Sequence, residues 1–281
     1  MILRSLRNHL TESAQRTAAA MIVAIGLATG LLGVTGFYSE VDDIEQLTLA
    51  SSSILQHQIN HSFLNIDDVL SDTASRIDID AWPDSPLIPW LQGRMASFPE
   101  ISAITLVKTN GYTTAGALTL QGLFGRSVDV TDRDYFKHHM NNPADSSLYI
   151  GAPMRNRLNG KPSIPVSKAI IAPNGRLKGI VLALVDPRAL ESAMLMMRTR
   201  GDIFNMLLKV DGTVLSRAPA LDVATGQSVL TEPFFQQVRQ SPLLGVGTFS
   251  SPLDGQQQIL SYRSLGRYPL VVVQACPAGT P

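Results

Sequence analysis

The stretch SIPVSKAIIAPNGRLKGIVLALV, residues 163–185, holds two β-rich runs separated by a short turn. Residues 163–171 and 177–185 are rich in Ile, Val, Leu and Ala, as buried strands are. Asn174-Gly175 between them is a residue pair that favours the tight turn of a β-hairpin. The stretch therefore predicts two antiparallel strands side by side, and with them a protein built around an antiparallel sheet.

The residues before this stretch extend the same pattern of short strands and Asn-Gly turns. A polar helix interrupts it, with Thr131 or Asp132 expected as the N-cap. This order predicts an antiparallel meander of the PAS-like kind, with helices packed on one side of the sheet. The elements expected, in order, are a strand over 101–108, a turn at Asn110-Gly111, a strand near 112–117, a helix over 129–140, strands near 148–157, and a turn at Asn159-Gly160.

The residues after the stretch repeat this order on a smaller scale, although no residue-level repeat is apparent. The whole chain is therefore expected to be α+β, with two related modules in tandem. A connecting helix with three Met residues, Met194, Met196 and Met197, joins them. This methionine cluster indicates flexible core packing and not a soft-metal site, because no His or Cys lies between the methionines. The expected elements are the connecting helix 187–199, strands 204–210 and 213–216, helix 232–240, and strands 246–250, 257–264 and 268–275.

A long amphipathic helix is expected ahead of both modules. Between residues 41 and 77 apolar side chains recur at steps of three and four, with no Pro or Gly to break the helix. The block Trp82-Pro83-Asp84-Ser85-Pro86 ends it, and a short helix is expected over 87–97. Ser51–Ser53 interrupts the apolar stripe. A helix of this length must pack along a domain or against a second copy of itself.

The first residues predict a membrane anchor. Residues 18–38 form an uncharged, mostly apolar run of about 21 residues, long enough for one transmembrane helix. Arg4, Arg7 and Arg16 precede the run and four acids follow it, which places the N-terminus in the cytoplasm and the bulk of the chain outside. A cleaved signal peptide is the alternative, but its apolar core would be shorter and would end in small residues. The later apolar runs are strand-sized, so a single-pass protein of the inner membrane is expected.

Composition and motifs exclude several function classes. The chain has 281 residues with 23 basic and 23 acidic side chains, so no basic stripe is available for nucleic acid. The one cysteine, Cys276, cannot form an internal disulfide; a quiet thiol at a strand end is favoured over pairing between chains. No nucleophile elbow, phosphate-binding loop or zinc signature is present. His57 and His61 have a metal-binding spacing but no partner nearby. No enzyme activity, metal or cofactor is therefore expected.

The segment with the highest density of polar groups is DVTDRDYFK, residues 129–137. Arg133 offers a planar fork that can hold a carboxylate by two hydrogen bonds. Tyr135 adds a hydroxyl, and a helix start offers free N–H groups. Taken alone, the segment fits either a structural role or an anion site.

This segment and its neighbours resemble the double Cache domains, which are tandem PAS-like extracytoplasmic sensors of bacterial receptors. The resemblance covers about residues 40 to 275 and is closest to sensors attached to diguanylate cyclases and histidine kinases. Its short motifs keep the order and spacing of the family. They are residues 132–136, 148–153, 159–162, 164–168, 175–181 and 185–186 in the first module, and 211–215, 226, 234–235, 247–249, 254–255, 261–265 and 268–273 in the second.

The resemblance implies that the membrane-distal module binds a small organic acid or amino acid. Arg133 and Tyr135 would grip the ligand, Phe136 would wall it, and Ser167 with Lys168 would complete a polar rim. Asp186 would recognise an ammonium group or only cap the next helix. The ligand-binding residues predicted on this basis are Arg133, Asp134, Tyr135, Phe136, Tyr149, Ser167, Lys168 and Asp186.

The chain departs from the family pattern because it reaches residue 281 with no second span and no output domain. We therefore expect a membrane-anchored sensor that acts through association, as a homodimer of the stalk helix. The alternatives are a ligand-free dimerising adaptor for an intact receptor, or a fragment of a cyclase or kinase. The expected division is 1–17 cytoplasmic, 18–38 transmembrane, 39–80 stalk, 81–200 distal module, 201–276 proximal module and 277–281 tail.

Overall fold

The computed structural model describes residues 45–82, 84–114, 117–198, 203–220, 225–250 and 257–277. The predicted cytoplasmic segment, transmembrane helix and first turn of the stalk lie outside these residues. No helix within the described ranges is long and apolar enough to cross a membrane.

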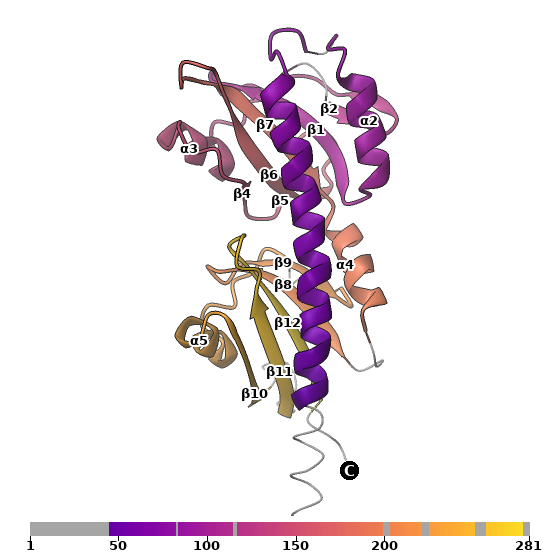
Figure 1. Ribbon diagram of the computed structural model, residues 1–281, viewed down its shortest axis with the longest axis vertical. Coiled ribbons are helices and arrows are strands. Elements are labelled where there is room, and N and C mark those ends of the chain that lie inside the picture. Colours follow the sequence, from indigo (N-terminus) through magenta and orange to yellow (C-terminus); the bar gives the residue numbers. More distant parts are fainter. Residues whose placement is uncertain are drawn as a thin grey trace, which may run out of the picture.

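The described residues form two antiparallel sheets, one in each module (Figure 1). The distal sheet has the order β3-β2-β1-β7-β6-β4, with β5 also paired to β6, and the proximal sheet has the order β10-β11-β12-β8-β9. The strands of the distal sheet are β1 Ile101–Lys108, β2 Ala117–Thr119, β3 Gly122–Phe124, β4 Tyr149–Ile150, β5 Met154–Arg155, β6 Pro162–Ile171 and β7 Leu177–Val185. Those of the proximal sheet are β8 Phe204–Lys209, β9 Val214–Ala218, β10 Leu244–Ser250, β11 Gln257–Ser264 and β12 Leu270–Pro277.

The two sheets share one topology. In chain order, β1, β2, β6 and β7 correspond to β8, β9, β11 and β12, and each set lies in the same spatial order. The predicted mixed α+β fold with two antiparallel modules is therefore confirmed.

Helices cover both faces of each sheet. The long helix, described over residues 45–76, runs along one face of both sheets, and α3 and α5 lie on the other side (Figure 1). The prediction that helices pack on one side only was wrong, because residues 180–185 of β7 are all apolar and buried, on both faces of the sheet. The shorter helices are α2 Ile88–Ser97, α3 Asp134–Asn141, α4 Pro187–Met196 and α5 Pro233–Gln240.

The apolar stripe of the long helix is buried within its own chain. Leu55, Ile59, Phe63 and Leu70 are 0% exposed and share one core with residues of both sheets. Burying a side chain of this size contributes roughly 1.5–3 kcal/mol. Of the two partners expected for this helix, a domain of its own chain and a second copy, the buried stripe uses the first.

Ser51 and Ser52 continue the buried face of the long helix instead of interrupting it. The hydroxyl of Ser51 donates to the side chain of Gln274 in β12. The hydroxyl of Ser52 accepts a hydrogen bond from Arg263 Nε at 3.2 Å. Polar positions on the helix thus match polar positions on the inner face of the proximal sheet.

Several element boundaries differ from those predicted. Helix α3 starts at Asp134 with Arg133 as N-cap, because the Asp129 carboxylate accepts the backbone N–H of Thr131 at 2.8 Å and forms a turn ahead of the helix. Instead of the single strand expected near 112–117, a hairpin of β2 and β3 lies further along the chain, over residues 117–124. Of the three methionines assigned to core packing, Met194 is buried, whereas Met196 is 83% exposed.

Candidate functional site

A small cavity of about 30 Å³ lies between the distal sheet and the segment that carries Arg133 and Tyr135. Thr105 of β1 and Leu182 of β7 line it from the sheet side. Arg157, from the turn between β5 and β6, also lines it. Of the eight ligand-binding residues predicted from sequence, Arg133 and Tyr135 line this cavity.

The Arg133 and Tyr135 side chains are held in different ways. Arg133 Nη2 donates to the backbone oxygen of Arg155 at 3.2 Å. Tyr135 is 1% exposed and belongs to the core beneath α3. Burial raises the pKa of the Tyr135 hydroxyl, although the Arg133 charge opposes the rise, so the hydroxyl is neutral at physiological pH.

Arg157 spans the polar segment beside the cavity. Its Nη2 donates to Asp132 Oδ2 at 2.7 Å, and its Nη1 donates to the backbone oxygen of Asp129. The hydrogen bond from Arg157 holds the pKa of the Asp132 carboxyl below its usual range. Both side chains are solvent-exposed, so the pair contributes at most about 1 kcal/mol. The ion pair therefore holds Arg157 only weakly at the edge of the cavity.

Asp134 and Phe136 are structural in this geometry. The Asp134 carboxylate accepts the backbone N–H of Ala152 at 2.9 Å and that of Tyr135 at 2.7 Å. Phe136 is 8% exposed and packs in the core between α3 and the sheet. Neither residue lines the small cavity.

Ser167 and Lys168 point to opposite faces of β6, because consecutive strand residues alternate. Ser167 Oγ is 2.9 Å from His139 Nε2 beneath α3. Lys168 Nζ reaches the long helix and donates to Asp67 Oδ1 at 2.5 Å. The two residues therefore do not form one polar rim with Arg133.

Tyr149 and Asp186 lie at two different openings between the modules. Tyr149, together with Lys168, lines a cleft of about 570 Å³. Asp186 lines a separate groove of about 400 Å³. Its carboxylate accepts the backbone N–H of Arg188 at 2.9 Å and caps α4. The interpretation of Asp186 as a helix cap is thus confirmed.

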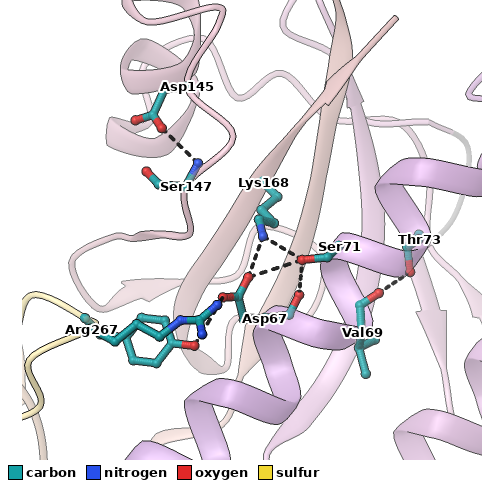
Figure 2. Close-up of polar contacts among 9 residues, drawn as sticks. Asp67, Val69, Ser71, Thr73, Asp145, Ser147, Lys168 and Arg267 are labelled. Carbon is teal, nitrogen blue, oxygen red and sulfur yellow. Dashed lines mark hydrogen bonds and ion pairs between the residues drawn. The ribbon is translucent and has the colours of Figure 1, made fainter. Parts of the chain in front are cut away.

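Sequence reasoning missed a buried polar junction centred on Asp67 of the long helix (Figure 2). Its carboxylate also accepts hydrogen bonds from Arg267 Nη2 and from the Tyr268 hydroxyl, each at 3.2 Å. Burial alone would raise the pKa of Asp67, but the bonds and charges of Lys168, Tyr268 and Arg267 outweigh it and lower the pKa. The one sequence signal was an acid on the buried face of the helix, four residues after Phe63.

The two adjacent histidines of α3 are also held separately. The His138 ring stacks on Tyr149 with centroids 4.2 Å apart, and His139 is fully buried against Ser167. In the described ranges no three His, Cys, Asp or Glu side chains are grouped closely enough to hold a metal ion. Cys276 is buried in β12.

Comparison with known proteins defines the class of this fold. The profile of the dCache_1-like family, described as a histidine kinase sensor domain, matches residues 193–275. The extracellular domain assigned to the histidine kinase rpHK1S-Z16 is 26% identical, with a TM-score of 0.73 over 84% of this chain and 95% of that one. No curated protein matches the chain.

Two amino-acid chemoreceptor domains share the fold at lower identity. The ligand-binding domain of Pseudomonas aeruginosa PctB, in complex with L-Arg, is 15% identical, with a TM-score of 0.62 over 84% of this chain and 88% of that one. That of Pseudomonas fluorescens CtaA, in complex with L-isoleucine, is 14% identical, with a TM-score of 0.59 over 84% and 93%. The resemblance to double Cache sensor domains is therefore confirmed.

Proposed function

We propose that the chain is a membrane-anchored periplasmic sensor that binds a small carboxylate or amino-acid-like ligand in the distal cavity. The observation that carries the proposal is the meeting of Arg133, Tyr135 and Arg157 around one cavity between the sheet and α3. The amino acid complexes of PctB and CtaA, which have the same fold, support this ligand class.

The class of ligand follows from the hydrogen-bond donors that Arg133 and Tyr135 offer. A guanidinium carries five N–H donors, and Arg133 uses Nη2 for the oxygen of Arg155. Its remaining donors can hold a carboxylate in a two-bond fork, which Lys could not do. The neutral Tyr135 hydroxyl supplies a further donor. Of the residues predicted from sequence, the proposal keeps Arg133 and Tyr135 at the ligand.

The cavity must widen to accept such a ligand. Its volume of about 30 Å³ is far below the roughly 300–1,000 Å³ of ligand sites. The turn that carries Arg157 and Leu158 lines the cavity, and breaking the exposed Arg157–Asp132 ion pair costs little free energy. We infer that the cavity is closed without ligand and opens by movement of this turn.

A ligand screen on the full chain in mild detergent tests the proposal. L-amino acids and small carboxylates are added, and the unfolding temperature is followed. A ligand at a hundredfold excess over its dissociation constant adds roughly 2.7 kcal/mol of stability. Arg133→Ala should abolish the shift, because a charge-assisted bond contributes about 1.5–3 kcal/mol. Arg176→Ala, in the exposed turn between β6 and β7, is the matched control and should keep it.

Two results would contradict this assignment. One is a folded Arg133→Ala protein that binds the ligand as tightly as the wild type. The other is a screen in which no compound stabilises the wild-type protein.

The membrane anchor is part of the same proposal. Residues 18–38 would span the inner membrane, with the two modules in the periplasm, as the charge bias around the run indicates. A reporter enzyme active only in the periplasm, fused after residue 281, should be active. A silent reporter in a well-expressed fusion would refute this orientation.

A second candidate function, a ligand-free adaptor that dimerises through the long helix, rests on one observation. Leu47 and Ile54 are 68% and 59% exposed, although the main stripe of the helix is buried. Apolar side chains exposed on one helix can pair with a second copy. In a Cys276→Ser background, Leu47→Cys should crosslink between chains and the buried Leu55→Cys should not. Absence of the Leu47→Cys crosslink in the membrane would exclude this dimer.

A further inference from the structure

The cleft of about 570 Å³ between the modules has no part in the function proposed above. The distal module contributes residues 146–150 and Lys168 to its lining, and the proximal module contributes residues 209–211 and 267–269. Asp67 of the long helix lines it as well. The cleft is within the size range of sites for small organic molecules. It is therefore large enough to hold a ligand without any movement.

The charges in this cleft favour an anion. Three cations line it, Lys168, Lys209 and Arg267, against two acids, Asp67 and Asp211, so the balance of three minus two is one positive charge. Asp67 is shared, because Lys168 lies 2.5 Å from its Oδ1 and Arg267 lies 3.2 Å from its Oδ2. Lys209 pairs with Asp211 at 2.9 Å. Asp67 thus forms ion pairs with two cations from different modules.

Arg267 is the cation best placed to take an added anion. Its side chain is 63% exposed, and its hydrogen bond to Asp67 uses Nη2. A planar guanidinium can bind a second acidic group through its other N–H donors. Figure 2 shows Arg267 and Lys168 approaching Asp67 from opposite sides, with the turn at Ser147 nearby. An anion beside Asp67 would therefore meet a cation from each module.

The opposite wall offers a polar side chain, His138. His138 lines the cleft next to Tyr149, and its Nε2 is buried. Within the described ranges this nitrogen makes no hydrogen bond; Asp145 Oδ2 lies 3.4 Å away without suitable alignment. A buried polar atom of this kind is stabilised by a partner. A ligand oxygen in the cleft could supply it.

We propose that this cleft is a second binding site, for a small organic anion with at least two acidic groups, held between Arg267 and Lys209 of the proximal module and Lys168 and His138 of the distal one. The cations lie on both modules, Lys168 on the distal one and Lys209 with Arg267 on the proximal one, so acidic groups at both ends of one molecule can engage both. Such a ligand favours the module arrangement in which it makes both sets of contacts. The site is independent of the distal cavity and of its ligand.

Calorimetric titration of the full chain in detergent tests this site. The probes are citrate, succinate and inorganic phosphate at constant ionic strength, with chloride as the control anion. Citrate or succinate should bind with one site per chain. Arg267→Gln and Lys209→Gln should each weaken that binding at least tenfold. Arg176→Gln, an exposed cation outside the cleft, should leave it unchanged, and so should Arg133→Ala, which affects only the distal cavity.

The outcomes separate this site from the distal one and from a purely structural role. Binding of phosphate alone would identify a simple oxyanion site and overturn the organic polyacid. Binding that Arg267→Gln leaves unchanged in a folded protein, or no binding of any probe at millimolar concentration, would overturn the site itself. Loss of binding in Arg133→Ala instead would assign the probe to the distal cavity.

Discussion

Replacement of Asp67 by Ala should destabilise the protein strongly, because it removes a buried acid that joins the long helix to both modules. Asp67 and Lys168 side chains are only 6% and 15% exposed, and their charged atoms are 2.5 Å apart. Removing one partner of a buried pair costs about 3–5 kcal/mol, since the other charge is left buried and unpaired. Lys168 keeps some contact with water, so we expect the lower end, about 3 kcal/mol.

Urea unfolding at pH 7, followed by circular dichroism, measures this loss as the difference in free energy of unfolding. Asp72→Ala is the matched control, because Asp72 pairs with the exposed Arg76 on the same helix and is itself only half-buried. Exposed pairs four residues apart contribute only about 0.3–0.5 kcal/mol. Asp67→Leu combined with Lys168→Met should recover much of the loss, since an apolar pair of similar size needs no partner.

The reasoning about this junction would be refuted by one result. If Asp67→Ala and Asp72→Ala lower the free energy of unfolding by the same small amount, the buried junction contributes nothing specific.

Two further predictions concern pH and packing. Burial, and then the neighbouring His138, lower the pKa of His139 to about 4 from its ordinary 6.5, so the unfolded state takes up the proton first. The free energy of unfolding should therefore fall by about 3 kcal/mol as the pH drops from about 6.5 to about 4, a difference of about 2.5 pH units. Urea midpoints across this range measure the loss. His139→Gln should flatten the pH profile. Gly179→Ala should cost about 1–3 kcal/mol, because its Cβ would lie 2.7 Å from the Val107 oxygen. Gly93→Ala, with open space in α2, should instead stabilise by about 0.5–1 kcal/mol; equal thermal shifts for the two variants would contradict this.

The sequence predicted those parts of the fold that depend on local signals. Strand β7 occupies residues 177–185 as predicted, because the Asn174-Gly175 turn before it and a run of apolar residues are local signals. The start of α3 was missed by a few residues, since the Asp129 side chain forms its own turn with Thr131. Strand β2 was missed because its run is only three residues long.

The candidate site was predictable only where its residues are neighbours in the chain. Arg133 and Tyr135 line one cavity because both belong to the segment that opens α3. Lys168 was assigned to that site, although its position next to Ser167 on a strand already required the opposite face. The junction at Asp67 joins residues 101 and 200 positions apart. No local pattern reports contacts of that kind.

The central claim, that the distal module binds a small carboxylate or amino acid, is tested most directly by calorimetric titration. The full-length wild-type and Arg133→Ala proteins are titrated with the strongest stabiliser found in the ligand screen. The account predicts saturable binding at one site per chain in the wild type, and at least a tenfold loss of affinity in a folded Arg133→Ala protein. Equal affinity in the two proteins would contradict it.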